Sequence, residues 1–415
     1  MLTHLRIQGF RCLQDTATDL TPITVFIGPN DSGKSSILDS LYALSQIARN
    51  GIERHALEQW AFDRFALPEA LSDGSSEQRK WKTKLLFRSQ DSNDVFDYEL
   101  LMRFSGDGDY LPTKETLSVG GEKLARSDGA KTIHFRENRG HPEKREQRFD
   151  QQSLGSTPKI PEGLKSKWFP FRSIAMQSFK ASALAAPCEI QARGVPRLGV
   201  DGSGLAAVLD YILGFERERF DKLEGDLKRF SPMIDKIQLR PAEPGPDRSF
   251  RGVGKVVFFK SKDGSVVPAF QASDGLLFAL GFLAVLYSPE PPRVLLVEEP
   301  ENGIHPENLE VVMGLFRRLA EGHFDAPPVQ VLLTTHSPYL LDYAQPEEVR
   351  VVTRNEKSGT QITPMTDIPN LKDELSEFKL GELWTAIGDE KIARIAGKPN
   401  SERGFLVSTS TTQVL

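Results

Sequence analysis

A single glycine-rich segment near the amino terminus constrains this chain more than any other feature. Residues Gly28–Ser35 read GPNDSGKS and fit the pattern G-x-x-x-x-G-K-[ST] in full. The apolar run Ile23–Ile27 before the segment predicts a strand, and Ser35–Ala48 after it predicts an amphipathic helix. A glycine turn between a strand and a helix aims backbone N–H groups at phosphate oxygens, so the sequence predicts a triphosphate site.

The residue types in this loop suggest individual roles. Lys34 is expected to reach the β- and γ-phosphates, and the Ser35 hydroxyl is expected to ligate Mg²⁺. The other residues expected to contact the nucleotide are Gly28, Asn30, Asp31, Ser32, Gly33 and Ser36. The alternative is a chance glycine turn before a helix, which the flanking strand and helix disfavour.

Two acids follow a second apolar run. Arg293–Val297 predicts a strand buried on both faces, and Glu298 and Glu299 come directly after it. Ligands of open α/β sheets bind at the carboxyl ends of the strands. We assign Glu298 to the metal and Glu299 to the attacking water, because phosphoryl transfer needs both charge neutralisation and a positioned nucleophile. The alternative is that both acids only cap the next helix.

One histidine follows a third apolar run. His336 comes after the predicted strand Val329–Thr334, which places it at the same edge of the sheet. An imidazole there can donate a hydrogen bond to a γ-phosphate and help to orient water. The alternative is a structural histidine, with Ser337 as helix N-cap and Pro338 as the first helical residue.

The order of elements predicts an α/β fold. Residues 1–50 and 271–365 are expected to form the nucleotide-binding core, 51–270 an inserted β-rich and helical lobe, and 366–415 a C-terminal helical segment with a mobile tail. Helices are expected at Asp274–Tyr287, at Pro306–Ala320 and from about Ser337. Within the insertion, strands are expected at Thr83–Arg88, Asp97–Phe104, Arg172–Met176, Ile237–Arg240 and Lys255–Lys260, and helices at Leu205–Leu213 and Phe215–Phe230.

Composition narrows the class of protein. Hydrophobic residues make up 39% of the chain and charged residues 26%, which is typical of a globular protein with a core. The net charge of −5 argues against a polybasic nucleic-acid binder. Cys12 and Cys188 form no disulfide framework, and no apolar run reaches bilayer-spanning length, so we expect a cytoplasmic protein with no membrane span.

Taken together, the motifs resemble a known family. The order is the phosphate loop, then Ser273-Asp274-Gly275, then LLVEEPENGIHP, then TTHSP. This order resembles the ABC-type ATPase heads of the SMC, RecF and OLD-like families. The likeness is greatest to compact AAA-like members of bacterial defence and DNA-processing systems that lack a Toprim domain. The resemblance implies an ABC-type P-loop head, with a mixed β-sheet, flanking helices and a large mixed α+β insertion.

The resemblance also implies roles for residues outside the phosphate loop. Ser273 and Gly275 match the signature motif, which contacts the γ-phosphate bound by a second copy. Asn302–His305 matches the D-loop along the dimer seam, and His336 matches the switch histidine. Arg11 lies where related heads place a residue near the nucleotide, and no glutamine can be assigned to the Q-loop. Two departures are Glu298, where many heads have aspartate, and S-D-G in place of S-G-G. For Ser273 alone, a plain helix N-cap is the alternative.

The implied function is an ATPase that uses ATP and Mg²⁺. Its heads would form a homodimer or higher homo-oligomer around ATP, as a switch that controls a separate effector such as a nuclease or toxin. One alternative is a RecF-like repair ATPase that binds DNA directly, and another is the nucleotide-binding subunit of an ABC transporter. A candidate DNA-contacting patch mixes cations and aromatics: Lys159, Lys165, Lys167, Arg172, Lys180, Trp168, Phe169, Phe171 and Phe179. It can equally be a solvated loop whose aromatics enter the core. Leu380–Trp384 can dock a partner or close the core of the head itself.

Overall fold

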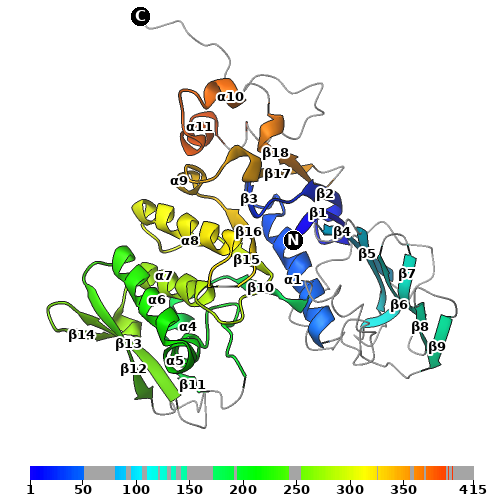
Figure 1. The fold of residues 1–415 in the computed structure, drawn as a ribbon. Helices are drawn as coiled ribbons and strands as arrows, with labels where there is room; N and C mark the ends of the chain where they lie inside the picture. Colours follow the sequence, from blue (N-terminus) through cyan, green and yellow to red (C-terminus); the bar gives the residue numbers. More distant parts are fainter. Residues whose placement is uncertain are drawn as a thin grey trace, which may run out of the picture. The chain divides into compact units, whose positions relative to one another are not determined.

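The chain forms two compact units in the computed structural model (Figure 1). The first comprises Met1–Ile174, Pro346–Phe378 and Leu383–Leu415, and the second comprises Ala175–Gln345 and Lys379–Glu382. The structure describes residues 1–50, 80–89, 95–104, 110–119, 122–128, 132–136, 142–146, 172–190, 194–242, 254–324, 326–355, 359–368, 371–388, 391 and 395. The predicted limits of the core, the inserted lobe and the C-terminal segment stay a prediction.

An antiparallel sheet forms much of the first unit. Its eight strands are ordered β2-β1-β4-β5-β6-β7-β8-β9. The strands are β1 (Leu2–Phe10), β2 (Leu13–Asp19), β4 (Lys80–Ser89), β5 (Val95–Phe104), β6 (Tyr110–Val119), β7 (Glu122–Asp128), β8 (Thr132–Arg136) and β9 (Pro142–Glu146). The strands predicted at Thr83–Arg88 and Asp97–Phe104 are thereby confirmed within β4 and β5.

The first unit also contains the strand and helix that flank the phosphate loop. β3 (Ile23–Ile27) is buried along its whole length, as a run of apolar and β-branched residues predicts. It pairs in parallel with β17 (Val349–Asn355), which pairs antiparallel with β18 (Gly359–Pro364). Helix α1 (Lys34–Asn50) leaves the loop, and the predicted strand–turn–helix arrangement is confirmed.

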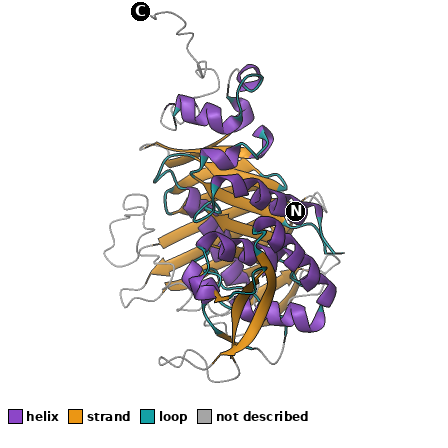
Figure 2. Cartoon of the chain, turned by 90° about the vertical axis from the view of Figure 1, so that its left-hand side faces the viewer, coloured by secondary structure: helices purple, strands orange, loops and turns teal. Residues whose placement is uncertain are grey.

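Helices and strands are interspersed through the described chain (Figure 2). The second unit combines helices with two groups of strands. β15 (Val294–Glu298) and β16 (Gln330–Thr335) pair in parallel. A separate antiparallel sheet has the order β11-β13-β12, with β14 on β13. Its strands are β11 (Cys188–Glu189), β12 (Ile234–Ala242), β13 (Gly254–Ser261) and β14 (Val266–Pro268). The main helices are α5 (Leu205–Phe215), α6 (Arg217–Phe230), α7 (Asp274–Leu286) and α8 (Leu309–Glu321), so every helix and strand predicted in 205–335 is present.

Smaller elements complete the described chain. They are β10 (Ile174–Gln177), α4 (Ala181–Ala185), η4 (Ala269–Gln271), η5 (Pro306–Asn308), α9 (Pro338–Leu341), η6 (Pro346–Glu348), η7 (Met365–Asp367), α10 (Leu371–Glu374) and α11 (Leu380–Ile387). The helix predicted from Ser337 is a single turn, because α9 ends at Leu341. The helix predicted from Pro306 begins as the 3₁₀ turn η5, with a proline at its start that has no N–H to donate.

Helix α7 forms the centre of the second unit. Every residue from Leu276 to Leu286 is buried, so the helix has no solvent-facing stripe. The Phe179 ring lies 4.8 Å from that of Phe282, centroid to centroid, and Phe282 meets Phe316 of α8 edge-on at 5.3 Å. The apolar run Leu276–Leu286 therefore forms a core helix. Among the residues that the structure describes, no helix is long and apolar enough to cross a bilayer.

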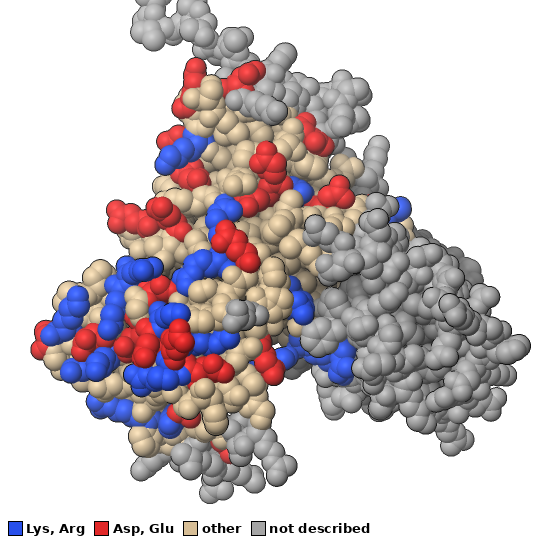
Figure 3. Space-filling view, viewed as in Figure 1, with Lys and Arg blue, Asp and Glu red and all other residues tan. Residues whose placement is uncertain are grey.

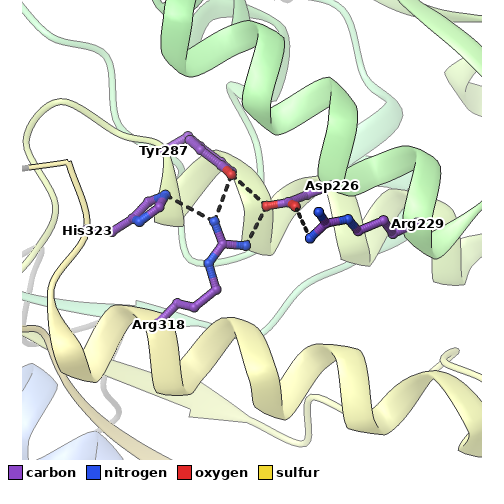
Figure 4. A network of polar contacts seen from close by, with 5 residues as sticks. All are labelled: Asp226, Arg229, Tyr287, Arg318 and His323. Atoms are coloured by element: carbon purple, nitrogen blue, oxygen red, sulfur yellow. Dashed lines mark hydrogen bonds and ion pairs between the residues drawn. The ribbon is translucent and has the colours of Figure 1, made fainter.

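A polar network ties the ends of α6, α7 and α8 together (Figure 4). Asp226 accepts a 2.6 Å hydrogen bond from the Tyr287 hydroxyl and one of 2.5 Å from Arg318. Arg318 also donates to the Tyr287 oxygen at 2.8 Å and lies 3.0 Å from Nε2 of His323. Burial and the bond to Asp226 raise the pKa of Tyr287 to about 12, so this tyrosine stays a neutral donor.

Candidate functional site

The phosphate loop is shaped by bonds within the first unit. Lys34 is only 6% exposed, and its Nζ donates to the carbonyl oxygens of Gly28 and Pro29, at 2.8 Å in each case. The Thr360 hydroxyl donates to the Ser32 carbonyl at 2.8 Å, which ties the loop to β18. The lysine head is thus held over the loop, where a phosphate can replace the two carbonyls as its partner.

Two glycines of this loop are required for steric reasons. Gly33 has φ +107, and a Cβ there would lie 2.5 Å from Thr360 Oγ1 and 2.8 Å from Cys12 Sγ. Gly28 has φ +157, and its Cβ would collide with the backbone carbonyl of Val352. Asp31 also takes a left-handed φ of 61, a conformation that aspartate adopts more readily than most residues. The tight turn therefore depends on these residue types.

The loop fits a magnesium-bound triphosphate. The first turn of α1 has no acid, so nothing there repels an anion at the helix N-terminus. Ser32 is 2% exposed, and within the described part of the chain its Oγ has no hydrogen-bond partner. Ser35 is exposed, which suits a hydroxyl expected to ligate a metal, whereas Ser36 is buried with its Oγ 3.5 Å from Cys12 Sγ. Asn30 is exposed as well.

The predicted acids belong to the second unit, at the carboxyl end of β15. In the parallel register Glu298 lies opposite Thr334 of β16, so both strands end at one edge. Glu299 has a left-handed φ of 44, and its amide donates to the Thr334 carbonyl at 3.0 Å. A non-glycine residue in this region is strained, and such strain is concentrated at functional sites.

His336 lies beside the second acid. Its Nε2 is 3.4 Å from Glu299 Oε1, and Asn302 donates to Glu299 Oε2 at 2.8 Å. The side chains of His336 and Glu299 are 35% and 38% exposed, which leaves both open to solvent. The parallel register of β15 and β16 thus brings together two residues that are 37 positions apart in the sequence. The Ser337 side chain makes no capping bond, although Ser337 precedes α9 as its N-cap residue.

The segment matched to the signature motif packs on the segment matched to the D-loop. Ser273 is exposed and caps α7, because its Oγ accepts from the Leu276 amide at 3.4 Å. A Cβ on Gly275 would lie 2.9 Å from the carbonyl oxygen of Gly303, so the two backbones touch. Asp274 begins the helix, where a negative charge is favourable. The N-cap alternative for Ser273 is therefore realised, and it leaves Ser273 exposed for a second contact.

Sequence reasoning missed two residues of the second unit. Gln177 ends β10 and is 4% exposed, and its Oε1 has no hydrogen-bond partner among the described residues. Glu301 accepts from the Thr335 hydroxyl at 2.7 Å and from the His336 amide at 2.9 Å. The glutamine had a sequence signal, since it ends a strand. The role of Glu301 depends on a contact across 35 residues that no local pattern reveals.

The remaining predicted residues have other positions. Arg11, with φ 50, pairs with Asp39 of α1 and so lies against the helix that leaves the phosphate loop. Of the proposed cation–aromatic patch, only Arg172, Phe179 and Lys180 are among the described residues, and Phe179 packs on α7. In Leu380–Trp384 the three large apolar side chains are buried, at most 4% exposed, which favours closure of the core over an open docking face.

Two ATPase family models match separate parts of the chain. A model described as "AAA ATPase domain" matches residues 1–99, and one described as "AAA domain, putative AbiEii toxin, Type IV TA system" matches residues 201–342. Together they include the phosphate loop, the acid edge and His336. Both matched models describe AAA domains, so these two parts of the chain are similar to AAA-family ATPases. The predicted α/β fold class is confirmed, and an ATPase of this family is what the motif order led us to expect.

Individual relatives of this ATPase are distant or partial. An OLD nuclease from Thermus scotoductus is 44% identical over 41 residues, which are 10% of this chain and 8% of that protein. The chain therefore spans only a small part of this curated relative.

Solved structures of SMC heads are similar at low identity. The SMC head bound to the C-winged helix domain of ScpA is 12% identical, covering 87% of this chain and 96% of that one, with a TM-score of 0.49. The SMC head domain from Thermotoga maritima is 12% identical, covering 88% and 98%, with a TM-score of 0.41. The Smc head with an extended coiled coil bound to the C-terminal domain of ScpA, from Pyrococcus furiosus, is 10% identical, covering 91% and 99%, with a TM-score of 0.47. The similarity to AAA-family ATPases rests on the two matched models and on the motif residues.

Proposed function

We propose that this ATPase binds Mg-ATP at Gly28–Ser36, hydrolyses it between two associated copies, and works as an ATP-gated switch for a separate effector. The observation that carries the proposal is the Glu299–His336 pair, which is half exposed and held at the carboxyl end of β15 and β16. In this proposal Glu299 positions the attacking water, and His336 donates a hydrogen bond to the γ-phosphate.

The phosphate-binding residues have distinct roles in this scheme. Lys34 exchanges its two carbonyl partners for phosphate oxygens, and the N-terminus of α1 faces the phosphates. Ser35 and Glu298 hold Mg²⁺, which neutralises phosphate charge when bound. We further propose Gln177 for the Q-loop position, because its buried carbonyl oxygen lacks a partner among the described residues and suits a metal-bound water.

A second copy is required to complete the site. Ser273 is exposed at the N-terminus of α7, where the end of the helix favours an anion. ATP bound to one copy would then be clamped by Ser273 and Gly275 of the other copy. Hydrolysis removes the γ-phosphate contacts and favours opening, which gives a two-state switch biased by ligand.

The effector is proposed from the relatives. One matched model is described as a putative toxin of a type IV toxin–antitoxin system, and the partial relative is a nuclease. Both descriptions support a role in anti-phage defence or DNA processing, with a nuclease or toxin as the controlled partner. A cytoplasmic location is part of this proposal.

Direct DNA binding has less support. Cationic and acidic side chains are mixed along α6 and form ion pairs, such as Lys222 with Glu218 and Arg217 with Asp221. In Figure 3 blue and red side chains are intermingled over the α6 region of the second unit. Phosphate backbones favour surfaces of one positive sign, so this face is not the binding surface that a RecF-like alternative needs.

Substitution of Glu299 tests the proposal. Glu299→Gln keeps the shape of the side chain and its bond from Asn302, but it removes the charge that polarises water. We expect ATP binding within about threefold of wild type and phosphate release reduced about a hundredfold or more. Glu310→Gln, in an exposed acid of α8, is the matched control and should hydrolyse normally. Equal turnover in Glu299→Gln and wild type would remove Glu299 from this role.

A further inference from the structure

The carboxylate of Glu301 joins two segments that end at the acid edge. Its Oε1 accepts from the Thr335 hydroxyl at 2.7 Å and from the His336 backbone amide at 2.9 Å. The Thr335 hydroxyl in turn accepts from the Ser337 amide at 2.9 Å. The backbone that carries His336 is therefore fixed by one side chain from the turn after β15.

The backbone of Glu301 is part of the turn that contacts α7. The Glu301 carbonyl accepts from the Ile304 amide at 3.0 Å, and this turn contains Gly303 at φ +72. The Gly303 carbonyl is the atom that a Cβ on Gly275 would meet at 2.9 Å. A displacement of the first turn of α7 thus has a continuous path of packed backbone to Glu301.

Each carboxylate oxygen of Glu299 contacts a residue that either neighbours Glu301 in the sequence or is hydrogen-bonded to it. Asn302 donates to Oε2 at 2.8 Å, and His336 Nε2 lies 3.4 Å from Oε1. The Asn302 amide also donates to the Glu299 carbonyl at 3.0 Å. Glu301 makes no contact with Glu299 among the hydrogen bonds of the described chain, so any influence on it acts through the placement of His336.

The second carboxylate oxygen of Glu301 makes it possible to distinguish a positioning role from a role that needs the negative charge. Oε2 is buried and has no hydrogen-bond partner among the described residues. All of the side-chain hydrogen bonds described for Glu301 therefore use Oε1, and a glutamine carbonyl can accept the same two bonds. A role as a base would need the carboxylate itself.

We propose that Glu301 is a positioning residue, which holds His336 against Glu299 and links that pair to the 302–305 turn. This inference rests on the proposed function for its effect on hydrolysis, but the hydrogen bonds to Thr335 and His336 exist independently of it. In the closed pair of heads, pressure on the 302–305 turn would be transmitted to His336 through Glu301.

Two substitutions at position 301 test the inference. Glu301→Ala removes the acceptor, so we expect kcat to fall about tenfold or more while KM for ATP stays within about twofold. Glu301→Gln keeps the acceptor and should recover most of kcat. Glu310→Ala, in an exposed acid of α8, is the control and should match wild type. Thr335→Val removes one of the two donors and should give an intermediate kcat.

Amide hydrogen exchange gives a readout that does not need ATPase activity. Exchange in the peptide around His336 should be faster in Glu301→Ala than in wild type and near wild type in Glu301→Gln. Wild-type kcat in Glu301→Ala would overturn the inference, as would a Glu301→Gln protein that regains slow exchange but not kcat. If the wild-type protein itself fails to hydrolyse ATP, the proposed function fails, whereas unchanged exchange in Glu301→Ala would refute the positioning role alone.

Discussion

At the scale of single residues, the phosphate loop is limited by space as well as by chemistry. Gly33 combines a left-handed φ with a hypothetical Cβ that would lie 2.5 Å from Thr360 Oγ1. Gly264, in the β13–β14 hairpin, has φ +87 but nothing within 4 Å of its hypothetical Cβ. Substituting these two glycines therefore distinguishes the cost of backbone strain, which both positions have, from the cost of a steric collision, which only Gly33 has.

Gly33→Ala should therefore abolish nucleotide binding and destabilise the fold, whereas Gly264→Ala should carry only the strain of about 1 kcal/mol. Titration with a fluorescent ATP analogue and chemical denaturation of both variants check this. Nucleotide affinity of wild-type strength in Gly33→Ala would contradict the assigned loop geometry.

Lys34 gives the corresponding test of charge. Its Nζ bonds two loop carbonyls in the structure and is expected to bond phosphates when nucleotide is bound. Lys34→Ala should weaken ATP binding about a hundredfold or more, because it removes a cation from a site of three or four phosphate charges. Isothermal titration with Mg-ATP measures the change. Lys255→Ala, which removes the partner of Asp210 in the same protein, should leave the affinity for ATP unchanged.

At the scale of elements, the first turn of α7 contacts the 302–305 turn backbone to backbone. Gly275→Ala would place a Cβ 2.9 Å from the Gly303 carbonyl, so the turn or the helix must shift. We expect nucleotide binding to persist while ATP hydrolysis falls at least about tenfold. Gly225→Ala, in α6 with open space around it, should be neutral or stabilising by about 0.5–1 kcal/mol. Full hydrolysis in Gly275→Ala would show that this contact is not required.

The network at the ends of α6, α7 and α8 makes a prediction about stability. Asp226→Ala leaves Arg318 and the Tyr287 hydroxyl without their acceptor, and the Asp226 side chain is only 12% exposed. We expect a loss of about 2 kcal/mol in the free energy of unfolding. Asp221→Ala, whose ion pair with Arg217 is exposed, should cost about 0.5 kcal/mol or less. Urea denaturation followed by circular dichroism compares the two variants, and equal losses would contradict the buried role of the network.

The same elements show what sequence reasoning could predict. Continuous apolar runs such as Ile23–Ile27 and Arg293–Val297 correctly predicted β3 and β15, because a strand buried on both faces is apolar along its whole length. Leu13–Asp19 forms β2 although it reads LQDTATD, because it pairs with the adjacent strand β1 and its Thr16 hydroxyl donates to the carbonyl of Thr360, far along the chain. β18 was not predicted for a similar reason, because it is a polar strand that pairs with β17 in a hairpin.

The residues of the candidate site also divide into those with a local sequence signal and those without one. Residues within one motif, such as Lys34 and Ser35, were predicted because their spacing alone fixes the chemistry. The parallel register that brings Glu299 to His336 was expected only as a shared sheet edge, and the distance came from the structure. Glu301 could not be predicted, because its bond from the His336 amide joins residues 35 positions apart. Gln177 had only the weak signal of a place at the end of a strand, since its burial came from the structure.

At the scale of the whole molecule, the parts of the proposed site belong to different compact units. The phosphate loop is in the first unit, and Glu299, His336 and Ser273 are in the second. Nucleotide that contacts residues of two copies would couple the association of the copies to its own hydrolysis. We therefore predict that ATP controls assembly as well as chemistry.

The most direct test is the mass of the particle with and without nucleotide. Multi-angle light scattering of Glu299→Gln should give a monomer of about 46 kDa without nucleotide and a particle of twice that mass or a larger multiple with Mg-ATP. Adding Ser273→Arg to that variant should restore the monomer by placing bulk in the seam. A mass that does not change with Mg-ATP, in protein shown to bind it, would contradict the central claim that two copies clamp the triphosphate.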